Sequence, residues 1–403
     1  MNEVTTVGVL GAGTMGAGIA QIAAEAGLEV LVHDPLAGAT DRALERIGRF
    51  LARKVEKGQL TEAERAAAVG RLGTSAMLEG LGVAEIVIEA IPEDLELKRD
   101  AFRRLDGVAV ASTILATNTS SLAIARIASA TAHPGRVVGM HFFNPVPLMA
   151  LVEVIPGPMT DPGVTDSVAY LARLLGKTPV VAADTPGFIV NRVQRAYYLE
   201  AFRMLEGGLA DATAIDAAMR GIGFRLGPFE LADVVGTDIN LAAGISIFEG
   251  FFGDPRYRPA QVQRRVADAG RLGRKTSAGY YDYEADGTRG AAWPALVTRA
   301  GARPRLAHLD AAQIEARILA AIVNEAASAV ADGVGSPEAI DTAMRLATNW
   351  PEGPLAWGER IGLTSVVHSL DALHATVPDG RYRVTPILRV LADGGGSFFQ
   401  ARA

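Results

Sequence analysis

Short apolar runs alternate with amphipathic stretches along the first 190 residues of this chain. The runs at residues 7–10, 28–34, 85–91, 114–118, 137–141 and 150–155 are typical of buried strands. Helical character over residues 17–26 and 93–105 separates some of these runs. Because repeated strand–helix units form parallel sheets that are covered on both faces, the pattern predicts a doubly wound α/β sheet of the Rossmann type.

A glycine-rich turn follows the first apolar run at once, with the sequence Gly11-Ala12-Gly13-Thr14-Met15-Gly16. The first glycine permits a tight turn, the second lets the backbone approach a pyrophosphate, and the third lets the helix pack on the strand. The free N–H groups of the helix that begins here favour phosphate. A glycine pattern alone is weak, but one placed between a strand and a helix predicts a dinucleotide site.

The next predicted strand ends in Asp34, 18 residues after Gly16. A carboxylate in this position accepts hydrogen bonds from the diol of a ribose and repels a 2′-phosphate. The sequence therefore favours NAD over NADP as the cofactor.

His141 ends one apolar run, and Glu153 lies on the next, with Pro145 and Pro147 in the turn between them. A hairpin of this length can bring the two side chains together, and a carboxylate-oriented histidine is the apparatus of a general base. A histidine on an apolar strand is more often a core residue whose hydrogen bonds are satisfied. The interpretation of His141 as a general base therefore depends on the rest of the chain.

Polar residues also follow two other predicted strands. Glu93 and Lys98 come after one, and Asn118-Thr119-Ser120-Ser121 comes after the next. Ligands of parallel sheets bind at the carboxyl edge of the strands, so these residues are candidate ligand contacts. For Ser120, capping of a helix is an equally good interpretation.

Taken in order, these motifs resemble the L-3-hydroxyacyl-CoA dehydrogenase family over residues 5–283. The resemblance rests on the glycine turn, Asn118–Ser121, His141-Phe-Phe-Asn144-Pro145, Glu153, the run Pro186-Gly187-Phe188-Ile189-Val190-Asn191-Arg192, and the run Leu272–Tyr281. It implies a reversible, NAD-dependent oxidation of (3S)-3-hydroxyacyl-CoA, with a short-chain substrate such as 3-hydroxybutyryl-CoA. It further implies that His141 is the catalytic base, that Glu153 orients it, and that Ser120 and Asn191 contact the reacting substrate. The cofactor-side contacts that it implies, together with those of the glycine turn, are Gly11, Gly13, Thr14, Met15, Gly16, Asp34, Glu93, Lys98, Asn118, Ser120, Asn144 and Lys275.

Residues 41–57 carry a basic helical stripe beside an apolar one. Such a stripe could hold the phosphates of coenzyme A, or a carrier protein that bears the acyl group, or it could be a solvated face. By its position in the family, Lys54, just off the stripe, is the candidate contact to coenzyme A.

The second half of the chain repeats itself. A shift of 125 residues places Arg192, Glu200 and the run 214–216 on Arg317, Glu325 and the run 339–341. This match predicts a duplicated helical domain. The expected organisation is a Rossmann domain at residues 1–185, a first helical copy at 186–283 that completes the active site, a linker at 284–308, and a second copy at 309–403. The fold class is thus a Rossmann-type sheet followed by two tandem all-α domains.

The second copy has lost the ligand residues of the first, because Asn191 falls on Ala316 and Lys275 on Gln400. We therefore expect it to be structural. It could take the place of a partner subunit and give a pseudo-dimer within one chain, or it could add a separate dimer interface, so the protein would be a monomer or a homodimer.

Composition narrows the range of possible functions further. A net charge of −6 gives no reason to expect nucleic acid as a partner, and the absence of cysteine excludes disulfides, thiolate metal sites and cysteine nucleophiles. No metal site is predicted. No apolar run reaches membrane-spanning length and the N-terminus lacks a basic signal start, so a cytoplasmic protein without a membrane partner is expected.

Two other functions fit parts of the pattern. One is a dehydrogenase of a free hydroxy acid, and the other is a non-catalytic NAD-binding protein. The Phe142–Pro145 run favours a thioester substrate, and the joint presence of Ser120, His141, Glu153 and Asn191 argues for catalysis.

Overall fold

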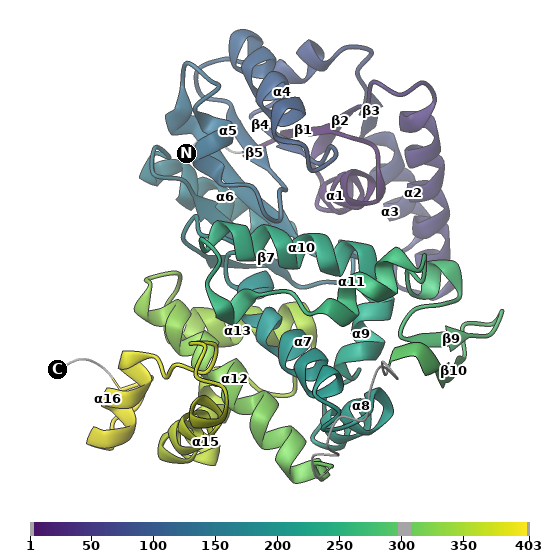
Figure 1. The fold of residues 1–403 in the computed structure, drawn as a ribbon. Helices are drawn as coiled ribbons and strands as arrows, with labels where there is room; N and C mark the ends of the chain where they lie inside the picture. Colours follow the sequence, from purple (N-terminus) through teal and green to yellow (C-terminus); the bar gives the residue numbers. More distant parts are fainter. Residues whose placement is uncertain (1–3, 297–307, 401–403) are drawn as a thin grey trace. The chain divides into compact units, whose positions relative to one another are not determined.

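A computed structural model describes residues 4–296 and 308–400 and divides the chain into two compact units, residues 1–188 and 189–403. The first unit is a single sheet between two layers of helices (Figure 1). Its strands run in the order β3-β2-β1-β4-β5-β6-β7-β8. Their bounds are β1 Thr6–Leu10, β2 Glu29–His33, β3 Leu72–Thr74, β4 Ile86–Glu89, β5 Ile114–Thr117, β6 Val137–Phe142, β7 Leu151–Pro156 and β8 Thr178–Val181.

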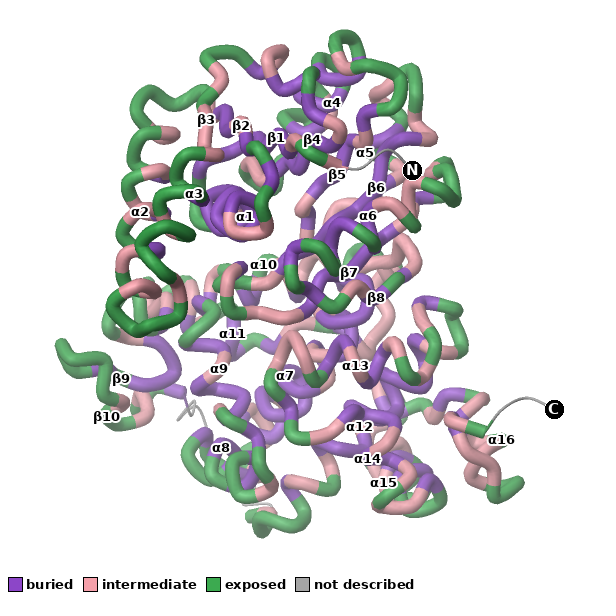
Figure 2. Tube along the Cα trace, turned by 180° about the vertical axis from the view of Figure 1, so that it is seen from behind, coloured by how far each residue is buried: buried purple, intermediate pink, exposed green. Residues whose placement is uncertain are grey.

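Every neighbouring pair in this sheet is parallel except β6 and β7. All residues of β4 and of β6 are buried, as expected of strands covered on both faces, and the central strands are coloured accordingly in Figure 2. The Rossmann-type sheet that the sequence predicts is therefore confirmed.

The helices of this unit cover the sheet from both sides. One layer packs around α1, which forms a shared apolar core with α2, α6 and the strands. The other layer is built from α4, α5 and a short 3₁₀ helix at Leu78–Val83. The bounds are α1 Thr14–Glu25, α2 Ala39–Glu56, α3 Glu62–Gly70, α4 Leu95–Val108, α5 Ile124–Ala128 and α6 Pro162–Leu174.

The second unit contains the duplicated helices. The first copy comprises α7 Val190–Glu206, α8 Ala212–Gly221, α9 Pro228–Val235, α10 Thr237–Gly250 and α11 Gln261–Asp268. The second comprises α12 Ala311–Ala331, α13 Pro337–Thr348, α14 Pro354–Ile361, α15 Leu363–Thr376 and α16 Pro386–Gly394. Five helices follow in the same order in each copy, as the repeat predicts, and α7 packs on α12.

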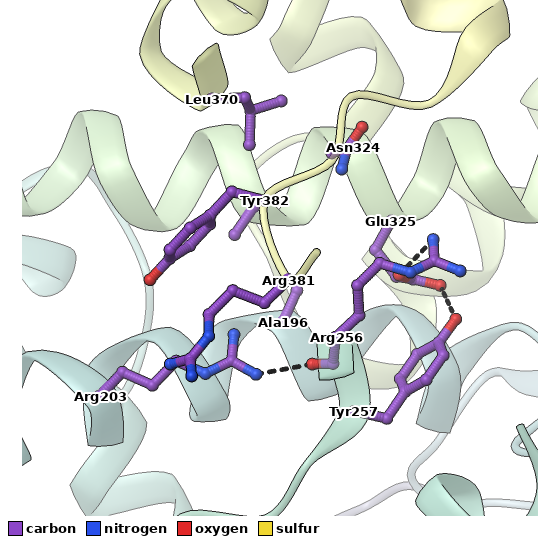
Figure 3. Close-up of a pocket in the computed structure, with 10 residues that line it drawn as sticks. Ala196, Arg203, Arg256, Tyr257, Asn324, Glu325, Leu370, Arg381 and Tyr382 are labelled. Atoms are coloured by element: carbon purple, nitrogen blue, oxygen red, sulfur yellow. Dashed lines mark hydrogen bonds and ion pairs between the residues drawn. The ribbon is translucent and has the colours of Figure 1, made fainter. Parts of the chain in front are cut away.

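Ion pairs cross between the copies in both directions. Arg192 of the first copy donates to Glu325 of the second at 2.7 Å, and Arg317 of the second donates to Glu200 of the first. The tyrosines follow the same rule, because Tyr257 of the first copy donates to Glu325 and Tyr382 of the second donates to Glu200. Figure 3 shows the small pocket at this junction, where the repeat-related pairs Ala196 and Ala321, Arg256 and Arg381, and Tyr257 and Tyr382 are among the lining residues.

Equivalent aspartates fix the same helix start in both copies. The carboxylate of Asp216 accepts from the backbone N–H groups of Phe229 and Glu230, at 3.0 and 3.1 Å. Asp341 accepts in the same way from the first turn of α14, at 2.8 and 2.9 Å. Each carboxylate satisfies two N–H groups that a helix start leaves unpaired.

The structure describes the first part of the predicted linker and its last residue. A hairpin of β9 Tyr281–Tyr283 and β10 Arg289–Ala292 precedes a 3₁₀ turn at Pro294–Leu296, whereas residues 297–307 of the linker lie outside the described residues.

Within the described part, no single helix is long and apolar enough to cross a membrane, and only α9 and α10 taken as a bent pair meet that criterion.

Candidate active site

The glycine turn after β1 has the shape that the sequence predicts for a phosphate-binding loop. Gly11 has a φ of 104°, and a Cβ there would lie 2.6 Å from the carbonyl oxygen of Ala90. A Cβ on Gly16 would lie 1.8 Å from the carbonyl oxygen of Gly11, but one on Gly13 would meet no atom within 4 Å. The first and third glycines are therefore demanded by packing, whereas Gly13 leaves open space against the backbone.

This open space lies at the start of α1. Gly13 is the N-cap of the helix, no side chain caps it, and its first turn holds no acidic residue. The free N–H groups and the positive end of the helix dipole suit a pyrophosphate. The loop thus fits NAD by the space, the donors and the charge that it offers.

Two charged side chains hold the loop in place. Asp34, just after β2, accepts from the N–H of Ala12 at 2.8 Å and from the N–H of Leu36 at 2.9 Å. Arg46 on α2 donates through Nη2 to the carbonyl oxygens of Ala12 and Gly13, at 3.2 and 2.9 Å. Sequence reasoning placed Arg46 only on a basic stripe. The structure shows that it clamps the glycine loop.

His141 and Glu153 face each other across the antiparallel pair β6 and β7, as directly opposite residues of the ladder. The Nδ1 atom of His141 lies 2.8 Å from Oε2 of Glu153, and both side chains are buried. An ionised carboxylate only accepts hydrogen bonds, so this contact favours the imidazole tautomer that carries its proton on Nδ1. The rings of Phe143 and Phe188, with centroids 4.5 and 5.9 Å from that of the imidazole, flank the histidine.

The residues after β5 form a loop organised by Glu93. Its Oε1 atom accepts from Oγ1 of Thr119 at 2.7 Å and from the backbone N–H groups of Ser120 and Ser121 at 2.9 and 3.0 Å. The hydroxyl of Ser120 lies farther away, at 3.3 Å. Glu93 therefore holds Ser120 through its backbone N–H and also through the hydroxyl that is expected to meet substrate.

Asn118 ties the same loop to the strand of the histidine. Its Oδ1 atom accepts from the N–H of Phe142 at 2.8 Å. Asn118, the first residue of the Ser120 loop, thus holds Phe142, which follows His141 in the chain.

Lys98 is more deeply buried than a side chain that contacts a cofactor at the protein surface would be. It is 1% exposed, and its Nζ atom lies 2.6 Å from Oε1 of Glu89 and 3.3 Å from Oε2 of Glu93. Burial raises the pKa of Glu89, although Lys98 opposes this effect, whereas Lys98 and the loop donors outweigh burial and lower the pKa of Glu93. Sequence reasoning did not identify Glu89 as a site residue, although an acid that ends an apolar strand is the signal that identified Asp34.

The predicted site residues of the first unit gather at one edge of the sheet. The glycine loop, Asp34, Glu93, the Asn118–Ser121 loop and the exposed Asn144 all follow the carboxyl ends of parallel strands. Lys54 lies elsewhere, near the end of α2, and is paired with Glu25.

Two predicted residues lie in the second unit. Asn191 is in the first turn of α7, and the Nζ atom of Lys275 lies 2.7 Å from both carboxylate oxygens of Asp238. Their contribution to the site remains a prediction of the sequence. Among the residues that the structure describes, no group of three or more His, Asp or Glu side chains could hold a metal ion.

A parallel sheet with a phosphate-binding loop, and a buried histidine–glutamate pair on that same sheet, have the architecture of an NAD-dependent dehydrogenase. Comparison with known proteins agrees. The family described as "3-hydroxyacyl-CoA dehydrogenase, NAD binding domain" matches residues 6–185, and the C-terminal domain of that family matches both 187–283 and 314–397.

The relatives extend over most of the chain. The 3-hydroxyadipyl-CoA dehydrogenase of Escherichia coli is 38% identical over 96% of this chain and 98% of that protein. A probable 3-hydroxybutyryl-CoA dehydrogenase of Bacillus subtilis is 44% identical over 70% of this chain and 98% of that protein. The crystal structure of a 3-hydroxybutyryl-CoA dehydrogenase from Escherichia coli superimposes with a TM-score of 0.88 at 36% identity, covering 98% of this chain and 100% of that one. The chain belongs to the 3-hydroxyacyl-CoA dehydrogenase family, which consists of NAD-dependent oxidoreductases, and carries the C-terminal domain of the family in two copies.

Proposed function

We propose that this chain oxidises short (3S)-3-hydroxyacyl-CoA thioesters reversibly, with His141 as the general base. The observation that carries the proposal is the 2.8 Å contact between Nδ1 of His141 and Oε2 of Glu153 within a buried strand pair. Bound NAD supplies the acceptor for the hydride that leaves the carbinol carbon.

The residues of the chain handle the proton. Nε2 of His141 takes it from the alcohol as the carbonyl forms, because a secondary alcohol does not lose hydride without losing its proton. Glu153 then stabilises the imidazolium and keeps the ring in the productive tautomer. Ser120 and Asn191 donate hydrogen bonds to the substrate oxygen, where negative charge grows in the reducing direction.

The cofactor-side roles are part of the same proposal. We assign the pyrophosphate to the loop of Gly11, Gly13, Thr14, Met15 and Gly16, and the adenosine ribose to Asp34. Glu93, Lys98, Asn118, Asn144 and Lys275 are proposed to act on the nicotinamide side, directly or through the groups that they hold. A cytoplasmic location stays a prediction of the sequence.

Lys54 is the proposed contact to the phosphates of coenzyme A. It is paired with Glu25, which also accepts from Gln21 at 2.7 Å, so binding of coenzyme A would exchange one anionic partner for another. A substitution of Lys54 by methionine should raise KM for the thioester and leave kcat nearly unchanged, because the contact lies outside the reacting atoms.

The substrate class is tested by following NADH oxidation with four acceptors: acetoacetyl-CoA, 3-oxoadipyl-CoA, free acetoacetate and acetoacetyl carrier protein. We expect turnover with the two CoA thioesters and little with the others. Faster turnover of free acetoacetate would favour a dehydrogenase of free hydroxy acids, and faster turnover of the carrier-bound substrate would assign the basic stripe to a carrier protein. Absence of turnover with every acceptor, in a chain that binds NADH, would overturn the enzymatic proposal.

We further propose that the second helical copy takes the place of a partner's helical domain, which gives a pseudo-dimer within one chain. The support is the reciprocity of the pairs Arg192–Glu325 and Arg317–Glu200, since an isologous dimer interface repeats each contact in the opposite direction. Native mass measurement should give the mass of one chain. A dimer joined through the first copy would contradict the proposal.

A further inference from the structure

Five residues at or beyond the ends of β4 and β5 form a closed ring of hydrogen bonds and ion pairs. Oε2 of Glu89 accepts from Oγ1 of Thr117 at 2.6 Å, and that hydroxyl oxygen accepts from the N–H of Thr119 at 3.2 Å. Oγ1 of Thr119 donates to Glu93 at 2.7 Å. Lys98 closes the ring between Glu93 and Glu89, at 3.3 and 2.6 Å.

The ring is buried where it meets the sheet. Glu89 and Thr117 are 0% exposed, and Thr119 and Lys98 are 1% exposed. Glu89 and Thr117 are also register partners of the parallel pair β4 and β5, so the two strands fix their spacing. Buried polar groups in a low-dielectric interior are costly unless every partner is in place, and a fully paired network is rigid.

This rigid ring supports the loop that carries Ser120. Glu93, a ring member, accepts the backbone N–H groups of both Ser120 and Ser121 through the same oxygen that accepts Thr119. Asn118, between the two ring threonines in sequence, accepts the N–H of Phe142 beside His141. A displacement of the ring would therefore move Ser120 with respect to the histidine.

We propose that this ring positions Ser120 and Asn118 for the dehydrogenase reaction, and that Glu89 and Thr117 are its positioning residues. The inference rests on the proposed function of His141 and Ser120. It gives Lys98 a role that its burial allows, which is to neutralise two carboxylates beneath the loop. A displacement of a reacting group by about 1 Å can lower a rate by about 100-fold, so small distortions of the ring should be visible in kcat.

The experiment compares a buried threonine at the end of β5 with another that lies just before its start. Thr117→Val removes the hydroxyl that links Glu89 to the loop. Thr113→Val is the matched control, because Thr113 is also 0% exposed and donates one hydrogen bond, to the carbonyl oxygen of Ala84 at 2.9 Å, but precedes the strand. Thr117→Ser restores the hydroxyl and serves as the rescue.

We measure kcat and KM for acetoacetyl-CoA, the Kd of NADH by fluorescence, and Tm for each full-length variant. Thr117→Val should lower kcat by roughly 10- to 100-fold, with KM and the Kd of NADH changed by less than about 3-fold. Thr117→Ser should recover most of this loss. Thr113→Val should keep kcat within about 2-fold while its Tm falls by as much as that of Thr117→Val.

A kcat of Thr117→Val within about 2-fold of the wild type, or an equal loss in Thr113→Val, would overturn the proposal. Should Thr117→Val not fold, Thr119→Val breaks the link to Glu93 instead and carries the same expectation. A wild-type chain that turns over no thioester would overturn the proposed function itself. An active wild type with an unaffected Thr117→Val would overturn only the role of the ring.

Discussion

The two helical copies share their structural contacts and differ at the residues that are expected to meet ligands. Asp216 and Asp341 hold equivalent helix starts, and the pairs Arg192–Glu325 and Arg317–Glu200 are mirror contacts. At the ligand positions the second copy instead has alanine and glutamine, where the first has Asn191 and Lys275. Packing has therefore been kept in both copies, and the proposed ligand contacts in one.

This difference indicates why some residues occur in both copies of the domain and others in only one. An arginine that crosses to the other copy is needed by both copies, because its loss takes from a buried glutamate the nearer of its two arginine partners. A residue that serves a ligand is needed only where a nucleotide-binding sheet accompanies the domain. The chain contains one such sheet within its described residues, so one set of ligand residues suffices.

The largest expected effect comes from breaking the crossed ion pairs. Arg192→Met and Arg317→Met should each lower the free energy of unfolding by about 3–5 kcal/mol, since each removes the nearer of two arginines from a buried carboxylate. Urea unfolding at pH 7 measures both. The control is Arg389→Met, whose pair with Asp371 is about half exposed and should cost about 0–1 kcal/mol. A cost below about 1 kcal/mol for Arg317→Met would show that the second copy is merely appended.

The next effect is on kcat, and it compares the two copies at one equivalent position. Asn191→Ala should lower kcat for acetoacetyl-CoA by roughly 100- to 1000-fold, as loss of a donor to a developing oxyanion does. Ala316→Asn, the reverse change in the second copy, should leave kcat unchanged because Ala316 is exposed on α12. Equal responses of the two variants, measured as steady-state NADH oxidation, would remove the functional distinction between the copies.

The smallest effect is a pH dependence of the free energy of unfolding, which we expect in both copies. Burial raises the pKa of Asp216 to about 7 and that of Asp341 to about 6, above the value of about 4 in an unfolded chain. A carboxyl group whose pKa is raised by folding stabilises the protein most at low pH, and this contribution is lost as the pH rises through the folded pKa.

Asp216→Asn, which does not titrate, should therefore destabilise the protein more at pH 5 than at pH 8, by about 1–2 kcal/mol. Asp341→Asn should behave alike, with its change completed about one pH unit lower. Unfolding in urea at both pH values checks the pair. A destabilisation that is the same at pH 5 and pH 8 would mean that neither carboxyl takes up a proton in the folded protein.

Much of the site could be predicted from the sequence because its signals are local. The glycine turn is six consecutive residues whose types match the φ angle of Gly11, the close packing of Gly16 and the open space at Gly13. His141 and Glu153 belong to one hairpin, so a short turn determines their pairing. The repeat revealed which residues of the second unit are equivalent.

The remaining contacts depend on choices that the sequence leaves open. The bond from Thr117 to Glu89 follows from the register of two parallel strands that are separated by a helix, and no local pattern sets that register. The repeat showed that Arg192 and Arg317 correspond, but not that each donates to the other copy. The clamp of Arg46 on the glycine loop requires the packing of α2 against α1, which brings it to Ala12 and Gly13.

The proposed reaction depends above all on His141 as the catalytic base. Its most direct test is His141→Gln, measured as kcat for acetoacetyl-CoA reduction together with the Kd of NADH. We expect kcat to fall by roughly 100- to 10,000-fold with the Kd of NADH nearly unchanged, because the side chain handles the proton and does not hold the cofactor. Near-normal turnover in this variant would show that His141 is not the base.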